Sequence, residues 1–95
     1  MAAREMLRVF AYDVTDDRRR TKIADLLEQV AVRVQLSVFE ARLSHAETKA
    51  LIRRLRPLFA AEDRLRLYTI DTAGLRHCQA IGGPPLAEAE DFWLL

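Results

Sequence analysis

Residues 6–13 read MLRVFAYD, an apolar run that ends in the acid Asp13. A run this rich in β-branched and aromatic residues predicts a strand whose side chains alternate between two faces. The alternation separates two sets, with Leu7, Val9 and Ala11 on one face and Arg8, Phe10 and Tyr12 on the other. Both faces are partly apolar, so Asp13 stands where a buried strand meets a charged turn.

The turn after Asp13 reads TDDRRR over residues 15–20 and opens a helix. Asp16 and Asp17 supply an N-cap and first-turn negative charge, and the helix carries an apolar stripe of Ile23, Leu26, Leu27 and Val30. An acid at a strand end beside clustered arginines could present metal-binding oxygens and phosphate-binding cations in one loop. The same acid is also a common turn former or helix cap, so the residues alone leave both roles open.

Basic residues gather in the first half of the chain. Residues 1–56 hold 12 Lys/Arg against 8 Asp/Glu (+4), residues 57–95 hold 3 against 6 (−3), and the sum is the net charge of +1. One cluster is Arg18, Arg19, Arg20 and Lys22, and a second is Arg53, Arg54 and Arg56. Guanidinium suits bidentate phosphate contact. We interpret the second cluster mainly as the solvated face of a helix, because its members line the polar side.

The rest of the chain alternates strands and helices. Residues 32–43 predict a hairpin that turns near Leu36-Ser37, and residues 64–71 and, more weakly, 75–81 predict strands. Ser44 and Glu47 form a capping box that opens a second helix, with the apolar stripe Leu51, Leu55, Leu58 and Phe59 and with Pro57 in its last turn. The order βαββαβ predicts an α+β, ferredoxin-like fold with an antiparallel sheet.

Two crossover helices leave one sheet face uncovered, where we expect Phe10, Tyr12 and Tyr68. We expect one domain over residues 1–95, with a core at 6–81 and a linker and C-terminal strand at 82–95. The chain ends in the apolar residues Phe92, Trp93, Leu94 and Leu95. This strand should pair with the edge of its own sheet or add to another chain.

Several classes of protein are excluded at this stage. No apolar run is long enough to span a membrane, and residues 1–5 lack the apolar stretch of a secretory signal, so we expect a cytoplasmic protein. Cys78 is the single cysteine, which excludes a disulfide within the chain and a cysteine-based zinc site.

Two motif blocks carry a resemblance to a known family. Tyr12-Asp13-Val14 precedes Asp16-Asp17 and Arg19-Arg20, and Arg33-Val34-Gln35 precedes Ser37-Val38-Phe39-Glu40. This combination resembles the CRISPR-associated protein two family, from about residue 6 to the apolar C-terminal strand. The resemblance implies a symmetric homodimer whose sheets face one another and whose C-terminal strands reach across to the other protomer. It also implies a role in CRISPR adaptation, in which the dimer bridges the integrase and holds DNA for spacer acquisition.

Members of this family are also described as metal-dependent endonucleases acting on single-stranded RNA or double-stranded DNA. The resemblance implies that Asp13 is the catalytic carboxylate and that the Asp13 side chains of both protomers hold Mg²⁺. Arg20, Lys22 and Arg33 match positions linked to nucleic acid, and we group Arg18 and Arg19 with them. Tyr12 and Phe39 match aromatic positions that stack a base or pack at the dimer interface. Phe92 to Leu95 would form the strand shared with a partner.

Two functions remain open, a DNA-holding scaffold that does not need hydrolysis and a nuclease. A further alternative outside CRISPR is a toxin-like ribonuclease of the virulence-associated family, which shares the fold.

Overall fold

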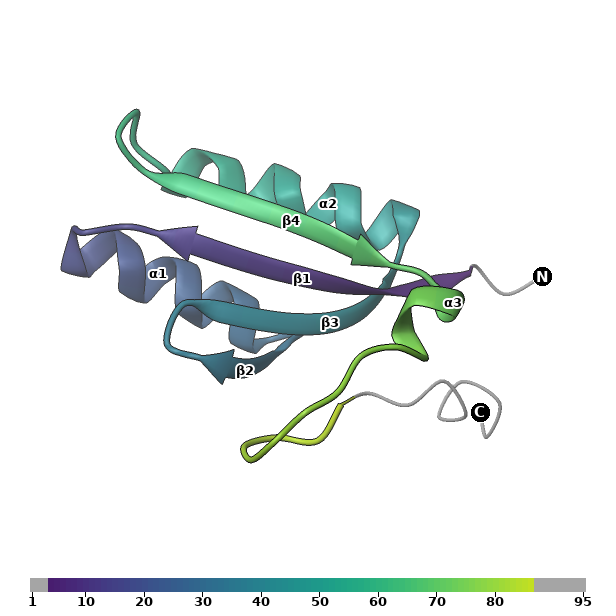
Figure 1. Ribbon diagram of the computed structural model, residues 1–95. Helices are drawn as coiled ribbons and strands as arrows, with labels where there is room; N and C mark the ends of the chain where they lie inside the picture. The colour runs from purple at the N-terminus through teal and green to yellow at the C-terminus, as the bar shows by residue number, and fades with distance from the viewer. Residues whose placement is uncertain (1–3, 87–95) are drawn as a thin grey trace.

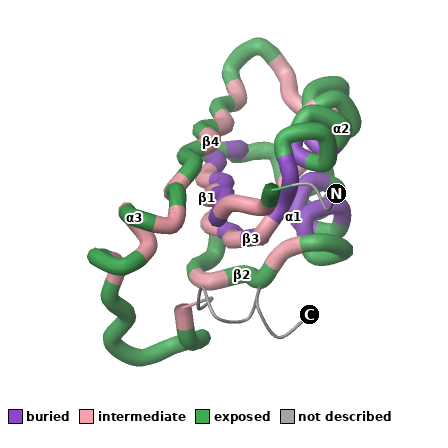
Figure 2. Tube along the Cα trace, turned by 90° about the vertical axis from the view of Figure 1, so that its right-hand side faces the viewer, coloured by how far each residue is buried: buried purple, intermediate pink, exposed green. Residues whose placement is uncertain are grey.

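A computed structural model describes residues 4–86, in which four strands form one antiparallel sheet of order β2-β3-β1-β4. The strands are β1 (Glu5–Asp13), β2 (Val32–Gln35), β3 (Val38–Ser44) and β4 (Arg64–Ile70). The helices are α1 (Asp17–Glu28), α2 (His45–Leu55), the 3-10 turn η1 (Arg56–Leu58) and α3 (Thr72–Leu75). Figure 2 places α1 and α2 on one face of the sheet and α3 beyond the other. The predicted α+β fold with its βαββαβ order is confirmed.

The predicted helix starts and the hairpin are also confirmed. The Asp16 carboxylate accepts a hydrogen bond from the backbone N–H of Arg19 at 2.9 Å and so caps α1. Ser44 and Glu47 make the reciprocal bonds of a capping box at 2.9 and 3.1 Å, which satisfy amides at the start of α2. The chain reverses between β2 and β3 at Leu36-Ser37.

The core lies between the sheet and the two long helices. Its fully buried side chains are Phe10, Phe39, Ile23, Leu27 and Leu55. Each such burial contributes about 1.5–3 kcal/mol, so this layer supplies much of the drive to fold. Tyr12, 7% exposed, belongs to the same cluster.

The expectation that Phe10 and Tyr12 face outward is therefore wrong. Both faces of β1 are apolar in sequence, and only the position of the helices decides which one is covered. The opposite face carries the alternate residues of β1, namely Leu7, Val9 and Ala11, whose partners in the β1–β4 register are Ile70, Tyr68 and Arg66. Leu7, at the end of this face next to α3, is 2% exposed, so the uncovered part of the face begins at Val9. Tyr68 is 50% exposed, so its predicted place on this face is confirmed. We call this surface the bare face; it belongs to the central strand β1 and its neighbours (Figure 1).

Three element boundaries differ from the sequence-based expectations. The strand expected at 75–81 is wrong, because Asp71 caps α3 by accepting from the Gly74 N–H at 2.8 Å, and no described residue after Ile70 is in a strand. Val30 lies beyond the end of α1 and is 46% exposed. Pro57 offers no backbone N–H, and α2 gives way to η1 before Leu58 and Phe59.

The expected C-terminal strand at Phe92 to Leu95 lies outside the described residues. Within residues 4–86, no helix has the length and apolarity needed to cross a membrane.

Candidate functional site

Asp13 is the last residue of β1 and lies on the bare face. It is exposed, and it pairs in register with Arg64 at the start of β4. Within residues 4–86 its carboxylate has no hydrogen bond or ion pair. Asp13 is therefore an acid with free oxygens at the edge of an apolar surface, which is unlike a helix cap or a turn former.

Tyr12 lies on the opposite face of the sheet, because neighbouring residues of a strand point to opposite sides. Its ring stacks on Phe39 with centroids 6.2 Å apart and an interplanar angle of 20°. The guanidinium carbon of Arg33 lies 5.1 Å from the centroid of the Phe39 ring, in cation–π range. Burial raises the pKa of Tyr12, while the positive charge of Arg33 acts to lower it. Phe39 exposes no surface, so its ring packs within the protomer and is not offered to a base.

Arg20 and Arg33 meet at a hollow of about 600 Å³ beside this aromatic pair. Tyr12, Asp25 and Glu28 line the same hollow, and Glu28 pairs with Arg33 at 3.3 Å. The structure thus brings together three of the predicted site residues, Tyr12, Arg20 and Arg33, but on the side of the sheet away from Asp13.

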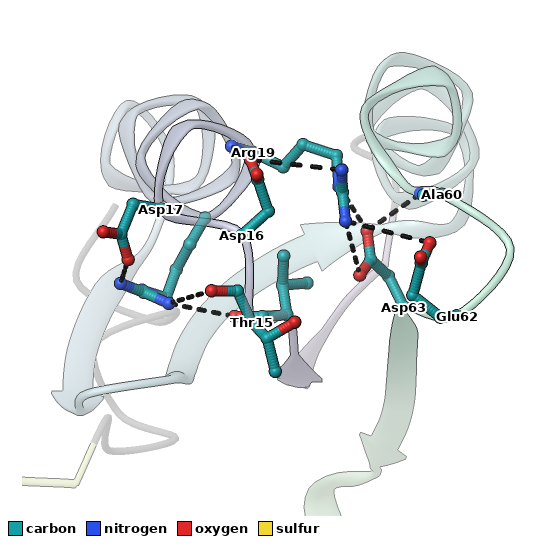
Figure 3. A network of polar contacts seen from close by, with 9 residues as sticks. Thr15, Asp16, Asp17, Arg19, Ala60, Glu62 and Asp63 are labelled. Atoms are coloured by element: carbon teal, nitrogen blue, oxygen red, sulfur yellow. Dashed lines mark hydrogen bonds and ion pairs between the residues drawn. The ribbon is translucent and has the colours of Figure 1, made fainter.

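Arg20 also fixes the loop that follows Asp13. One terminal nitrogen of its guanidinium donates to the carbonyl oxygens of Val14 and Thr15 at 3.1 and 3.2 Å, and the other pairs with Asp17 (Figure 3). These contacts hold the first turn of α1 against the end of β1. Arg20 therefore positions the segment that carries Asp13.

Arg19 has an intramolecular partner. Its guanidinium donates to both carboxylate oxygens of Asp63, at 2.7 and 3.2 Å, and lies 3.8 Å from Glu62 (Figure 3). The Asp63 side chain is 1% exposed and also accepts from the backbone N–H of Ala60 at 2.8 Å. The pair ties the start of α1 to the connection before β4. The nucleic-acid role of Arg19 stays a prediction, with a structural role now evident beside it.

Arg18 and Lys22 differ from Arg19, because they are exposed on α1 and have no ion pair among the described residues. They stand four residues apart, on one side of the helix. Of the predicted phosphate-binding cations, Arg18 and Lys22 are therefore the two whose charged groups are available to a ligand.

Sequence reasoning missed Arg64. This residue reads as an ordinary polar position at the start of a strand, and only the antiparallel register of β1 and β4 brings it opposite Asp13. No sequence signal identifies such a cross-strand neighbour, since register depends on which strands pair.

Within residues 4–86, no three His, Cys, Asp or Glu side chains gather as metal ligands. Asp13 is the acid whose exposed, unpaired oxygens have the chemistry that Mg²⁺ prefers. A single carboxylate is an incomplete donor set, so a metal here requires oxygens from outside this protomer.

Comparisons with known proteins agree on one family. The family model described as CRISPR associated protein Cas2 matches residues 6–77. This range includes Asp13 and all four strands except Glu5, the first residue of β1. The CRISPR-associated endoribonuclease Cas2 3 of Synechocystis sp. is 47% identical over 83 residues, which cover 86% of this chain and 90% of that relative.

Two solved structures resemble the fold closely. A hypothetical protein from Thermus thermophilus has a TM-score of 0.74 at 39% identity, covering 86% of this chain and 96% of that one. A chain in the structure of a partial Cas6-RT-Cas1–Cas2 complex has a TM-score of 0.74 at 27% identity, covering 87% of this chain and 92% of that one.

The Arg19–Asp63 pair generates a prediction about pH. Hydrogen bonds from Arg19 and the Ala60 amide hold the pKa of Asp63 below its ordinary value of 3.8. The stability that the carboxylate contributes is therefore full above the pKa of the unfolded chain and is lost as pH falls through the lower folded pKa. We expect Asp63→Asn to lower Tm at pH 6, and the difference from wild type to shrink below pH 4.

Thermal unfolding followed by circular dichroism at a series of pH values checks this expectation. The control is Glu62→Gln, which removes an exposed carboxylate near the same guanidinium and should change Tm little. An equal loss in the two variants, or a difference that persists unchanged at low pH, would contradict the assignment.

Proposed function

The chain belongs to the CRISPR-associated Cas2 family, and we propose that it works as a homodimer that binds nucleic acid and cleaves it as a Mg²⁺-dependent endonuclease. We further propose that the dimer bridges the CRISPR integrase and holds DNA during spacer acquisition. The observation that carries the proposal is the exposed, unpaired Asp13 carboxylate at the edge of an apolar sheet face.

The bare face is suited to a second copy of the chain. Val9 and Ala11 lie on its central strand, and Val38 and Ile70 extend the apolar surface onto β3 and β4. Covering such a surface removes apolar area from water, and two sheets that pack face to face lie about 10 Å apart. A two-fold axis makes the same patch serve both protomers. Asp13 shares this face, so an axis near the end of β1 places its two copies close together.

Two Asp13 carboxylates fit the donor set of Mg²⁺, which binds through one or two carboxylates and keeps water and phosphate oxygens as its other ligands. When bound, the ion would lower the pKa of a water ligand and neutralise charge that develops on the phosphate. The protein holds the Asp13 segment in place through the bonds of Arg20 to the loop carbonyls. Arg64, opposite Asp13, offers a guanidinium to a phosphate oxygen.

The remaining cations would orient the nucleic acid. Arg18 and Lys22 present their charges along α1, and Arg33 stands at the hollow beside Tyr12. Such contacts bind the phosphate backbone without reading its sequence.

A second candidate function is a scaffold in which hydrolysis is dispensable. The resemblance to a chain in the structure of a Cas6-RT-Cas1–Cas2 complex favours it, because that neighbour is part of an assembly with Cas1. The toxin-like alternative outside CRISPR loses its basis, since the matching family model is a CRISPR-associated one.

Replacing Asp13 tests the metal site. We expect Asp13→Asn to reduce Mg²⁺-dependent cleavage by about 100-fold or more, because the ion's stabilisation of charge is worth several kcal/mol. Cleavage of single-stranded RNA and of duplex DNA is measured with and without EDTA, and Glu62→Gln serves as the matched loss of an exposed carboxylate. Unchanged cleavage by Asp13→Asn would refute the assignment. Spacer acquisition is assayed with the same variants, and acquisition that persists without cleavage would identify a scaffold.

A charge placed on the bare face tests the dimer. Val9 lies at its centre, between Glu40 of β3 and Tyr68 of β4. We expect Val9→Glu to dissociate the dimer at micromolar concentration, because sheet-on-sheet packing would bury the new carboxylate without a partner. Sedimentation velocity measures the change. Ala46→Glu, at an exposed position of α2, should leave the dimer intact. A monomeric wild type, or a Val9→Glu variant that remains dimeric, would overturn this arrangement.

The salt dependence of binding tests the α1 cations. Each phosphate contact contributes about 0.7–0.9 to the slope of log K against log salt concentration. We expect replacement of Arg18 and Lys22 by Ala to reduce that slope by up to about 2, because each side chain makes at most one such contact. Fluorescence anisotropy with labelled DNA gives the slope, and Arg4→Ala serves as the control. An unchanged slope in the double variant would exclude α1 from the binding surface.

A further inference from the structure

A groove of about 660 Å³ lies between α2 and β4, on the helix-covered side of the sheet. Its cationic lining consists of Lys49 and Arg53 of α2, Arg56 of η1 and Arg8 of β1, with His45 at one end. No acidic residue is among the described residues that line it. Four permanent positive charges therefore share one cavity without a carboxylate.

The cations follow a regular pattern along the helix. Lys49 and Arg53 stand four residues apart, which corresponds to about 6 Å along the helix axis, and Arg56 follows three residues later. Like charges at this spacing repel one another and destabilise a helix. Lys49 and Arg53 therefore repel each other, and an anion in the groove would offset that repulsion.

Arg8 is the strongest evidence for a ligand, because it is an arginine on the covered face of the central strand. It is 5% exposed, and its Nε donates to the Leu43 carbonyl at 3.1 Å and its Nη1 to the Thr69 hydroxyl at 2.9 Å. Its Nη2 is buried with no hydrogen-bond partner among residues 4–86. Neither partner that the guanidinium does have is charged. A buried cation without a counter-ion is costly, and its field is little screened in these surroundings.

We propose that this groove is a second anion site, which binds a run of phosphates. Guanidinium groups match the geometry of phosphate oxygens, and several cations along one groove match a linear array of negative charges. Ile52 and Leu67 form apolar walls between the cations, which focus the field into the groove. The same chemistry is offered by a free oligophosphate and by the backbone of a single-stranded nucleic acid.

The groove is separate from the proposed metal site. Arg8 and Asp13 stand five residues apart on β1, about 17 Å at the rise of a strand, and they point to opposite faces. Binding in the groove therefore does not depend on Asp13, on a metal ion or on cleavage, and the proposal can fail or succeed independently of the nuclease.

Nuclear magnetic resonance of the ¹⁵N-labelled full chain in the presence of EDTA tests the proposal. Inorganic tripolyphosphate and an oligothymidylate without terminal phosphates are titrated separately, as the two sources of a phosphate run. We expect saturable shifts of the backbone amides of Thr48, Ile52 and Leu67 with at least one probe. Binding of either probe there supports the site, and the tighter probe identifies the source.

Adjacent arginines of α2 provide a matched control. Arg53 lines the groove and Arg54 does not, yet both are exposed, and a charge reversal at either changes the net charge equally. We expect Arg53→Glu to raise the Kd for phosphate by about tenfold or more and Arg54→Glu to raise it by less than about twofold. Only the Arg53 variant loses a charged hydrogen bond to the ligand. Arg56→Ala serves as a second groove variant should Arg53→Glu fail to fold.

Three outcomes would overturn the proposal. The first is an equal loss of affinity in Arg53→Glu and Arg54→Glu, which would indicate diffuse surface charge. The second is the absence of saturable shifts in the groove with both phosphate probes. The third is a groove that responds to an acidic peptide, titrated in the same way, but to neither phosphate probe, which would indicate a carboxylate-bearing protein partner.

Discussion

The side chains of β1 alternate between the two faces of the sheet, and this alternation decides which residues each face presents. This strand lies between β3 and β4, so both of its faces belong to the centre of the sheet. Arg8, Phe10 and Tyr12 point under the helices, and the residues between them point to the bare face with Asp13. A shift of one residue in register would exchange the two sets and bury Asp13 instead of Arg8. The core, the candidate metal site and the cationic groove all follow from one register.

The polar contacts at the end of β1 divide the arginine cluster by role. Arg19 donates hydrogen bonds to Asp63, and Arg20 donates to the carbonyls of the loop. Arg18 and Lys22 are exposed and make no such bond among the described residues. A bidentate pair with a carboxylate that is almost fully buried holds a side chain far more firmly than an exposed ion pair does. Within the arginine cluster, Arg19 and Arg20 therefore stabilise the loop after Asp13 and the start of α1, whereas Arg18 and Lys22 are available to bind a ligand.

Much of the fold could be predicted because its signals are local. The Asp16 cap, the Ser44–Glu47 capping box and the apolar stripe of α1 each depend on residues within one or two turns. The errors have a different origin. The expectation for Phe10 and Tyr12 is wrong because both faces of β1 are apolar and the helices cover only one of them. The strand expected at 75–81 is wrong because the cap at Asp71 starts a short helix that outweighs a weak strand pattern. The first error depends on helix packing that a local pattern does not reveal, whereas the second reflects two local signals in competition.

The order of elements, the strand-end position of Asp13 and the family resemblance can all be read from the amino-acid sequence, because each depends on neighbouring residues. The folded chain is needed to show which face of β1 is covered, that Arg64 stands opposite Asp13, and that Asp63 binds Arg19. It also placed Arg8 against the basic stripe of α2. These contacts join distant segments, such as Arg8 and Thr69, which are 61 residues apart, and they are fixed by strand register and helix packing. Both are properties of the assembled chain.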